Sequence, residues 1–165
     1  MQDGTFRFKV CPALVQDRAF ESTCGALFDH DLDGDLDLMI GSGGNDTQVD
    51  KINFVVRFYK NDGRGNFTAS PGSIPKVIGN FSTLEVNDYD DDGDTDVFLG
   101  ARAVPGNYGL PPQSYLLNND QGNWLNVAPP ALGNVGMVTD ATWADVDGDK
   151  DNDLVVVGDW MAITI

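Results

Sequence analysis

The feature that most constrains this chain is a run of nine residues with aspartate at every second position, and this run occurs three times. The runs cover residues 29–37, 88–96 and 145–153, and they begin 59 and 57 residues apart (29 to 88, 88 to 145). Five carboxylates in nine residues repel one another, and an apolar core cannot take them up. A hard multivalent cation makes such a cluster favourable. The near-regular spacing indicates a part that each structural unit repeats.

Short apolar segments flank every run. Those before the runs are residues 25–28, 82–86 and 141–144, and those after them, each ending in glycine, are residues 38–41, 97–100 and 154–158. They are too short and too apolar for amphipathic helices, so the pattern predicts buried strands on both sides of each acidic loop. A third strand is expected at 53–60 and at 114–118. A polar turn follows each, and a fourth strand then starts at Asn66 and at Asn123. Residues 4–10 are similar to that fourth strand, and residues 160–165 fall where a further third strand begins.

Four short strands per unit, a period just under 60 residues and almost no helix signal predict an all-β fold of β-propeller blades. A β-sandwich is the alternative, but it does not require the same loop at a near-regular period. We expect one domain over residues 1–165, with repeat units at about 23–80, 81–137 and 138–165 and an N-terminal strand at 4–10. Propellers typically close with about four to eight blades. About three four-stranded blades therefore predict a partial propeller, or one that the association of copies completes.

The composition of the chain limits the classes of molecule that we expect it to bind. The formal charge is −16, from 26 acidic and 10 basic residues. A basic patch for phosphate is missing, so we expect no nucleic-acid partner. No stretch approaches the roughly 18–20 apolar residues of a membrane span. The first ten residues lack the apolar core of a signal peptide, so an export signal is expected upstream or already removed. Cys11 and Cys24 are compatible with one disulfide or with two free thiols.

The acidic runs have the chemistry of a calcium site. Calcium takes six to eight oxygen ligands from a flexible set of carboxylates and carbonyls. Positions 1, 3, 5 and 9 of a run supply carboxylates in this interpretation, and position 7 supplies a backbone carbonyl. We expect up to three Ca²⁺ ions, held by Asp29, Asp31, Asp33, Asp35, Asp37, Asp88, Asp90, Asp92, Asp94, Asp96, Asp145, Asp147, Asp149, Asp151 and Asp153.

Glycine at position 6 permits the left-handed turn that wraps such a loop. Gly34 and Gly93 occupy that position, whereas the third run has Lys150 there and a glycine at position 4, Gly148. A lysine with positive φ is strained, and its ammonium group would lie near the cation. The third site is therefore expected to be weaker or to be wrapped differently.

Other metal sites fit less well. Magnesium prefers few protein ligands and keeps its waters. Zinc prefers Cys or His, and the single histidine, His30, is at an even position that is expected to point outward into solvent. An EF-hand needs an acidic ligand at position 12, where this chain has Ile40, Leu99 and Val156. That position excludes a dockerin as well.

The three acidic runs, the apolar-glycine segment after each and the stretch Asn-Asp-Gly-Arg-Gly-Asn-Phe at 61–67 resemble the FG-GAP/VCBS repeat over nearly the whole chain. This is the calcium-bearing blade that is also found in integrin alpha-subunit propellers. Residues 100–117 and 136–140 look like large exported bacterial proteins of this class, some with an ASPIC/UnbV domain. The resemblance implies a parent of seven or eight blades, an extracellular, periplasmic or cell-surface location, and adhesion or ligand binding. It does not specify one biochemical function.

Two classes of function remain open. One is a binding or scaffold module in which calcium is mainly structural, with an unknown protein or glycan as its ligand. The alternative is a propeller-based polysaccharide lyase or hydrolase, for which the spacing selects no carboxylate pair outside the runs. The Pro- and Gly-rich segment 102–113 carries Arg102 and Tyr108, which are the tentative ligand-binding residues. Trp124, Trp143 and Trp160 are either sugar-stacking residues or core.

Overall fold

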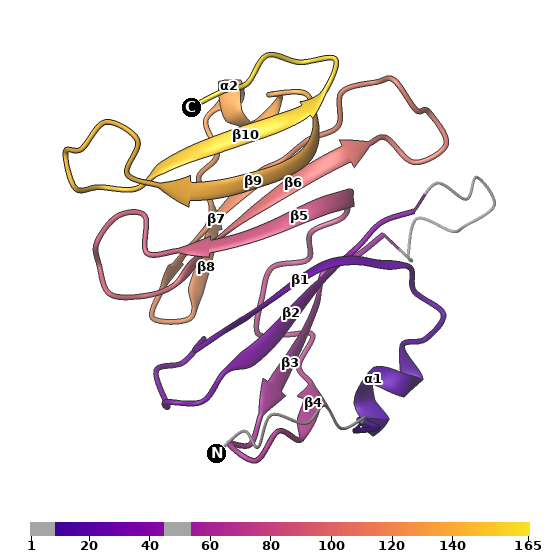
Figure 1. Cartoon of the computed structure of the whole chain (residues 1–165). Coiled ribbons are helices and arrows are strands. Elements are labelled where there is room, and N and C mark those ends of the chain that lie inside the picture. The colour runs from indigo at the N-terminus through magenta and orange to yellow at the C-terminus, as the bar shows by residue number, and fades with distance from the viewer. Residues whose placement is uncertain (1–8, 45–53) are drawn as a thin grey trace.

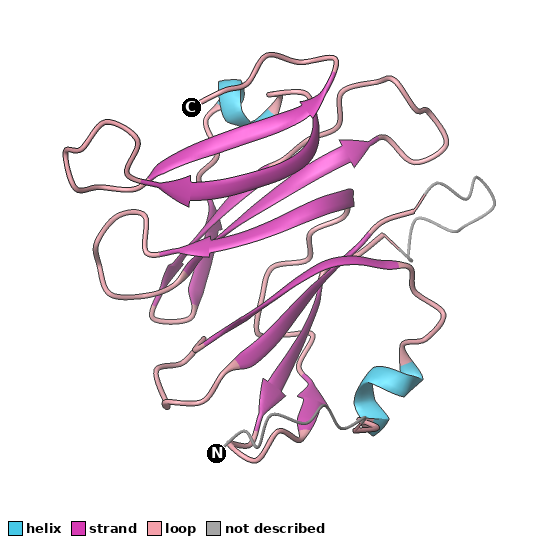
Figure 2. Cartoon of the chain, in the orientation of Figure 1, coloured by secondary structure: helices cyan, strands magenta, loops and turns pink. Residues whose placement is uncertain are grey.

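The structure is a computed structural model that describes residues 9–44 and 54–165. Its strands form three antiparallel sheets, stacked one after another along the chain (Figure 1). Two short helices, at the places where prolines begin a turn of helix, were not predicted from the sequence. Figure 2 shows how small a part of the chain they make up. The fold is all-β, as predicted.

Each sheet is one blade of a propeller-like arrangement. Blade 1 contains β1 (Ser22–Phe28), β2 (Asp37–Ser42), β3 (Arg57–Asn61) and β4 (Phe67–Ala69), after helix α1 (Pro12–Gln16). Blade 2 contains β5 (Asn80–Asn87), β6 (Asp96–Ala103), β7 (Tyr115–Asp120) and β8 (Asn123–Asn126). Helix α2 (Pro130–Gly133) precedes blade 3, which contains β9 (Met137–Ala144) and β10 (Asp153–Asp159). Strand order within blades 1 and 2 follows the chain.

Several strand boundaries differ from the prediction. The third strand of blade 1 begins at Arg57 rather than at residue 53, which lies outside the described residues. Residues 4–8 of the predicted N-terminal strand also lie outside them, and Lys9 and Val10 are not in a strand. At the C-terminal end, a single bridge between Val156 and Thr164 stands where a third strand was expected.

The blades pack face to face through their first strands. β5 lies against β1 and β2 of blade 1, and β9 lies against β5 and β6 of blade 2. One apolar cluster joins blades 1 and 2, with Phe28, Met39 and Leu99 among its members, and a second joins blades 2 and 3 around Phe98 and Val138. Blade 2 is thus covered on both faces.

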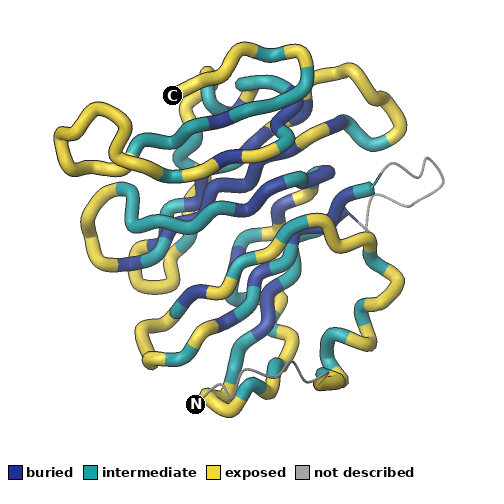
Figure 3. Tube along the Cα trace, viewed as in Figure 1, coloured by how far each residue is buried: buried dark blue, intermediate teal, exposed yellow. Residues whose placement is uncertain are grey.

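Burial follows from this stacking. β6 of blade 2 is buried at seven of its eight positions, as expected for a strand with both faces covered. β2 of blade 1 alternates between buried and half-buried residues, and β10 of blade 3 has one buried residue. Figure 3 shows the buried trace in the middle of the stack and exposed loops around it. Among residues 9–44 and 54–165, blade 2 is the blade that packs against another blade on both faces.

Candidate metal centres

The three acidic runs form hairpin loops at the same end of the three blades, on the left side of Figure 1. Loop 1 (residues 29–37) joins β1 to β2, loop 2 (88–96) joins β5 to β6, and loop 3 (145–153) joins β9 to β10. The strand pairs Phe28 with Asp37, Asn87 with Asp96 and Ala144 with Asp153 close them. Each loop is therefore held at its two ends by antiparallel strands.

All three loops wrap around the first aspartate of the run. In loop 1 the carboxylate of Asp29 accepts the backbone N–H groups of Asp33 (3.1 Å) and Gly34 (2.9 Å). Asp88 does the same for the corresponding residues of loop 2. In loop 3, Asp145 accepts N–H from Gly148 (2.7 Å) and Lys150 (3.2 Å). In every case the N–H of position 6 reaches the same carboxylate.

Lys150 adopts the strained conformation that the sequence predicted, with φ of 86°. The wrap of loop 3 differs in one hydrogen bond, because Asp145 accepts the N–H of position 4 where Asp29 and Asp88 accept that of position 5. In every loop, position 4 and position 6 both have left-handed φ angles, and one of these two residues is glycine. Glycine takes position 6 in loops 1 and 2 and position 4 in loop 3, and the partner positions are Leu32, Asp91 and Lys150. The positions of the left-handed residues are therefore the same in all three loops.

The loops bring carboxylates together. Carboxylate oxygens lie within 4.8 Å of one another in four groups: Asp29, Asp31 and Asp33; Asp88, Asp90 and Asp96; Asp145, Asp147 and Asp153; and Asp92, Asp94 and Asp120. Positions 1 and 3 belong to a group in every loop, joined by position 5 or 9. Asp35, Asp37, Asp149 and Asp151 belong to none of these groups.

Asp120 was missed by the sequence analysis as a site residue. It is the last residue of β7, and the register of blade 2 places it beside loop 2. The side chain of Asp94, at position 7, accepts N–H from Gln121 in the same turn (2.7 Å). The sequence did predict a polar turn at 118–122, but only the strand pairing shows that this turn lies against the loop.

The aspartate at position 9 connects the loop to the third strand. Asp96 is 1% exposed and accepts N–H groups from Asn119 (2.8 Å) and Tyr89 (3.1 Å). Asp37 is also buried and accepts the N–H of Asn61 (2.7 Å). Burial raises the pKa of Asp37, and it raises the pKa of Asp96 to about 6. Burial therefore disfavours the ionised form of both carboxyls.

Position 3 has different neighbours in loops 1 and 2. Lys60 donates to Asp31 with 2.7 Å between Nζ and Oδ2, and this hydrogen bond lowers the pKa of Asp31. In loop 2 the corresponding residue is Asn118, whose Nδ2 donates to Asp90 Oδ2 at 2.8 Å. Loop 1 therefore has an ammonium group where loop 2 has a neutral amide.

The prediction that His30, at position 2 of loop 1, points outward into solvent is wrong. Its side chain is 7% exposed and stacks on Trp124 of blade 2, with ring centroids 5.6 Å apart and planes at 10°. The ring of Phe58 makes an edge contact with the ring of His30, with centroids 4.7 Å apart. Burial lowers the pKa of His30. The burial of His30 comes from its contact with blade 2, because Val146 at the same position of loop 3 is 51% exposed.

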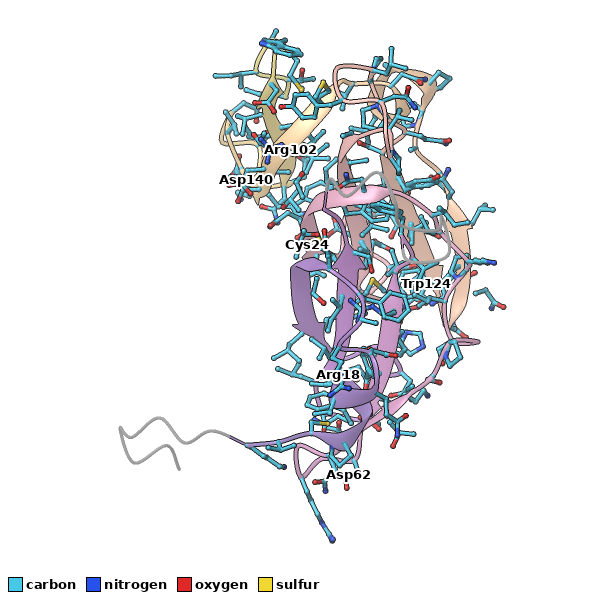
Figure 4. The ribbon with its side chains drawn as sticks, turned by 90° about the vertical axis from the view of Figure 1, so that its right-hand side faces the viewer. Arg18, Cys24, Asp62, Arg102, Trp124 and Asp140 are labelled. Carbon is cyan, nitrogen blue, oxygen red and sulfur yellow. The ribbon has the colours of Figure 1, made fainter. Side chains whose placement is uncertain are left out.

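Arg102 and Tyr108 lie together at the opposite end of the blades from the loops. Both donate to Asp159 Oδ2, Arg102 Nη2 at 3.3 Å and Tyr108 Oη at 2.9 Å. They line a hollow of about 450 Å³ between the blades. Figure 4 labels Arg102 in the upper part of the molecule, toward blade 3. The structure brings the two predicted residues together, but their ligand stays a prediction.

The tryptophans and cysteines take different roles. Trp124 and Trp143 pack against the apolar clusters, whereas Trp160 is 82% exposed and lies edge-on to Tyr108. Cys11 and Cys24 are free thiols. Burial raises the pKa of Cys24 to about 11, so this thiol is inert at neutral pH.

Comparison with known proteins identifies the family to which the chain belongs. No curated protein matched the chain. In the described part of the chain, no helix is long and apolar enough to cross a membrane. The model of the FG-GAP-like repeat matches twice, over residues 29–99 and 88–156. Each match begins at the first aspartate of a loop and extends through the following loop into the next blade. Together they cover most of the chain, which therefore belongs to the FG-GAP-like repeat family.

Proposed function

We propose that each aspartate loop binds one Ca²⁺ ion and that the protein is a calcium-stabilised binding module that works outside the cytoplasm. The observation that carries the proposal is the threefold convergence of carboxylate oxygens within 4.8 Å, from positions 1, 3 and either 5 or 9 of each loop. The FG-GAP-like family and its propeller-like blades support a module of this kind.

The chemistry of the ligands favours calcium. The groups contain aspartates alone, and a loop of hard oxygen donors with no fixed octahedral cage suits Ca²⁺ better than Mg²⁺. At position 7 of loop 2, Oδ2 of Asp94 accepts the N–H of Gln121, and the Asp94 carboxylate belongs to the group with Asp92 and Asp120. Crowding is visible in loop 3, where the hydrogen bond from Asp151 to Asp149 and their repulsion raise the pKa of Asp151. A divalent ion would relieve this repulsion.

A structural role follows from where the loops lie. Each loop links the first two strands of its blade, and in blades 1 and 2 the buried aspartate at position 9 also holds the third strand through a backbone N–H group. A cation among these carboxylates would fix three strands at once. It would also offset the cost of burying the charge of Asp37 and Asp96.

The hollow at Arg102 and Tyr108 is the surface that we propose for an extracellular protein or glycan ligand. It lies away from the loops, and it is lined by hydroxyl, amide and aromatic groups, including Thr139, Asn80 and Phe81. Such a mixture of aromatic and hydrogen-bonding side chains suits polar ligands with one apolar face. A glycan array with wild type and Tyr108→Ala checks this part. Binding without turnover is expected, whereas depolymerisation of a bound glycan would support a lyase or hydrolase.

Thermal unfolding and calorimetry test the calcium proposal. Calcium titrated into chelator-treated protein should bind with up to three ions per chain, and EDTA should lower the melting temperature, because the ion binds the folded state. Magnesium at the same concentration serves as the control and should restore less stability. A melting curve that is the same in EDTA and in calcium would contradict the proposal.

A further inference from the structure

A second hollow, the β3 hollow, is separate from the aspartate loops and from the hollow at Arg102 and Tyr108. Its volume is about 370 Å³, and it lies beside the start of β3. Its walls come from β3 and the two residues before it, from β4 and the segment at 71–76, and from the segment between α1 and β1. We propose that the β3 hollow binds a small molecule with an apolar body and one negative charge, such as a medium-chain carboxylate. This inference does not depend on calcium or on the function proposed above.

Most of the wall of the β3 hollow is apolar. Phe58 and Ile74 line it and also belong to the buried cluster that joins blades 1 and 2. Pro71 and Pro75 add apolar surface from the segment after β4, and their rings leave that segment little freedom to lose when a ligand binds. Apolar walls with a few placed polar groups are typical of small-molecule sites.

Arg57 places a positive charge in this apolar wall. Its guanidinium group lies over the ring of Phe20, 4.5 Å from the centroid, and Nη2 donates to Ser22 Oγ at 2.7 Å. These two contacts hold the group in place. Arg57 Nε is buried and has no hydrogen-bond partner among the described residues. The described contacts therefore leave part of the hydrogen-bonding capacity of this guanidinium unused, and a carboxylate is the acceptor that matches its planar fork.

The blade fold does not require this charge. β3 and β7 are the third strands of blades 1 and 2, and their pairing with Ile40 and Leu99 puts Arg57 and Tyr115 at the same place. Tyr115 is neutral, and its hydroxyl donates to the carbonyl of Ile78 at 3.4 Å. An arginine in an apolar wall is thus particular to blade 1, as expected for a residue that contacts a ligand rather than one that builds the sheet.

The charged groups of the β3 hollow are positive in total. Arg57 and Lys76 line it, and among the described residues Asp17 is the one carboxylate that does so. Asp17 already accepts a hydrogen bond from the hydroxyl of Tyr59. Burial raises the pKa of Tyr59 to about 12, so this hydroxyl stays a donor at neutral pH. A carboxylate ligand would therefore meet two cationic groups and one anion that is already hydrogen-bonded.

The charge of the whole chain limits the ligand to a monoanion. At −16 the chain repels anions at long range. Charges more than about 8 Å away are largely screened at physiological ionic strength, so one carboxylate at Arg57 responds mainly to its neighbours. The repulsion grows with the charge of the ligand, which disfavours phosphate esters and polyanions. Binding then needs the apolar wall as well as the two cations.

The volume sets the size of the ligand. It corresponds to roughly twelve groups of the size of a water molecule, at about 30 Å³ each. Octanoate, with about ten non-hydrogen atoms, is a suitable probe on this scale. Each methylene group that enters the hollow should strengthen binding about fourfold, so hexanoate should bind roughly tenfold more weakly than octanoate.

An NMR titration of the calcium-saturated chain tests the inference, with octanoate, octanol and octylamine as anionic, neutral and cationic probes of equal length. Octanoate should bind about 10- to 100-fold more tightly than octanol, because hydrogen bonds between charged groups are the stronger ones. Octylamine should not bind at the β3 hollow. The backbone signals that octanoate moves should be those of β3 and of the segment at 71–76.

Four variants separate the charge from the apolar wall. Arg57→Met keeps a flexible side chain beside Phe20 without the charge, so octanoate should bind as weakly as octanol. Lys76→Met should weaken octanoate binding about threefold, because Lys76 is exposed. Ala69→Phe fills the hollow from β4 and should abolish binding of both probes. Arg64→Met is the matched control, because it removes the same charge from an exposed turn of blade 1 outside the hollow.

Urea unfolding should show that each variant is folded. Three results would overturn the inference: equal affinity for octanoate and octanol, octanoate binding that Arg57→Met leaves unchanged, or moved signals confined to the aspartate loops. If Arg57→Met is unfolded, the other variants decide. Loss of both probes in Ala69→Phe together with weaker octanoate binding in Lys76→Met would then support the inference, and unchanged binding in either of these variants would overturn it.

Discussion

Loop 1 and loop 2 have the same backbone and different electrostatic surroundings. In both, the first aspartate accepts two N–H groups from positions 5 and 6, and φ is positive at positions 4 and 6. The third strand then supplies Lys60 beside Asp31 in blade 1 and Asn118 beside Asp90 in blade 2. The repeat thus sets the geometry of a loop, whereas residues outside the run set its charge.

The two loops also differ in the number of backbone N–H groups that the aspartate at position 9 accepts. Asp96 accepts two backbone N–H groups, from Asn119 and Tyr89, whereas the described contacts of Asp37 include one, from Asn61. Loop 2 therefore combines more hydrogen bonds with less competing positive charge. We expect it to bind calcium more tightly than loop 1 and to contribute more to the stability of its blade.

The largest expected difference comes from removing the aspartate at position 9. Each buried donor left without a partner costs about 1–3 kcal/mol. Asp96→Ala should therefore lower the free energy of unfolding by about 2–6 kcal/mol and Asp37→Ala by about 1–3 kcal/mol, in addition to any loss of calcium binding. Urea unfolding in saturating calcium measures both. Equal losses for the two variants would show that the additional hydrogen bond of Asp96 does not contribute to stability. Asp96→Asn, which keeps a hydrogen-bond acceptor, is the control.

Exchanging the residues beside position 3 should exchange the affinities of the loops. Lys60→Asn removes a positive charge next to loop 1, and Asn118→Lys adds one next to loop 2. Because a unit charge a few ångströms from a divalent ion changes its energy by about 1–2 kcal/mol even in water, each change should alter calcium affinity by roughly tenfold. Calorimetry should show tighter binding for the first variant and weaker binding for the second. Lys60→Arg keeps the charge and should leave the affinity near that of wild type.

The pH dependence should reverse between the ion-free and the calcium-bound protein. Burial raises the pKa of Asp96 to about 6, above its value of about 3.9 in an unfolded chain. The folded ion-free protein therefore binds more protons, and its stability should fall as pH rises from about 4 through 6. Calcium needs the ionised carboxylate, so calcium-bound stability should instead fall as pH decreases through this window. Melting temperatures at pH 5 and 7, with calcium and with EDTA, measure both trends. The same slope in both solutions would contradict the role of Asp96 in the site.

Much of the fold could be predicted because the acidic runs fix the chain at regular places. Strands β1, β2, β5, β6, β9 and β10 lie where apolar segments flank the runs. A run of five aspartates cannot enter a core, so it must form a loop, and the segments beside it must carry the burial. The prolines at the start of α1 and α2 were a usable helix signal that the all-β pattern concealed.

The residues that were missed depend on contacts between blades or between distant strands. Asp120 joins loop 2 through the register of β7, which no local pattern records. His30 looks like an exposed loop residue until blade 2 places Trp124 against it. The pattern within one segment predicted the loops and the strands beside them, whereas it could not predict neighbours from other strands.

The smallest expected effect concerns the residues with positive φ. Lys150 in loop 3 and Leu32 in loop 1 both hold a left-handed conformation, with φ of 86° and 58°. Lys150→Gly and Leu32→Gly should each relieve strain of about 1–2 kcal/mol, but the flexible unfolded chain offsets about 0.4–1 kcal/mol of it. We expect both variants to be more stable by about 1 kcal/mol or less in urea unfolding. Because Lys150→Gly also removes a positive charge beside loop 3, it alone should tighten calcium binding. Equal calcium affinity in the two variants would show that the charge of Lys150 does not weaken calcium binding by loop 3.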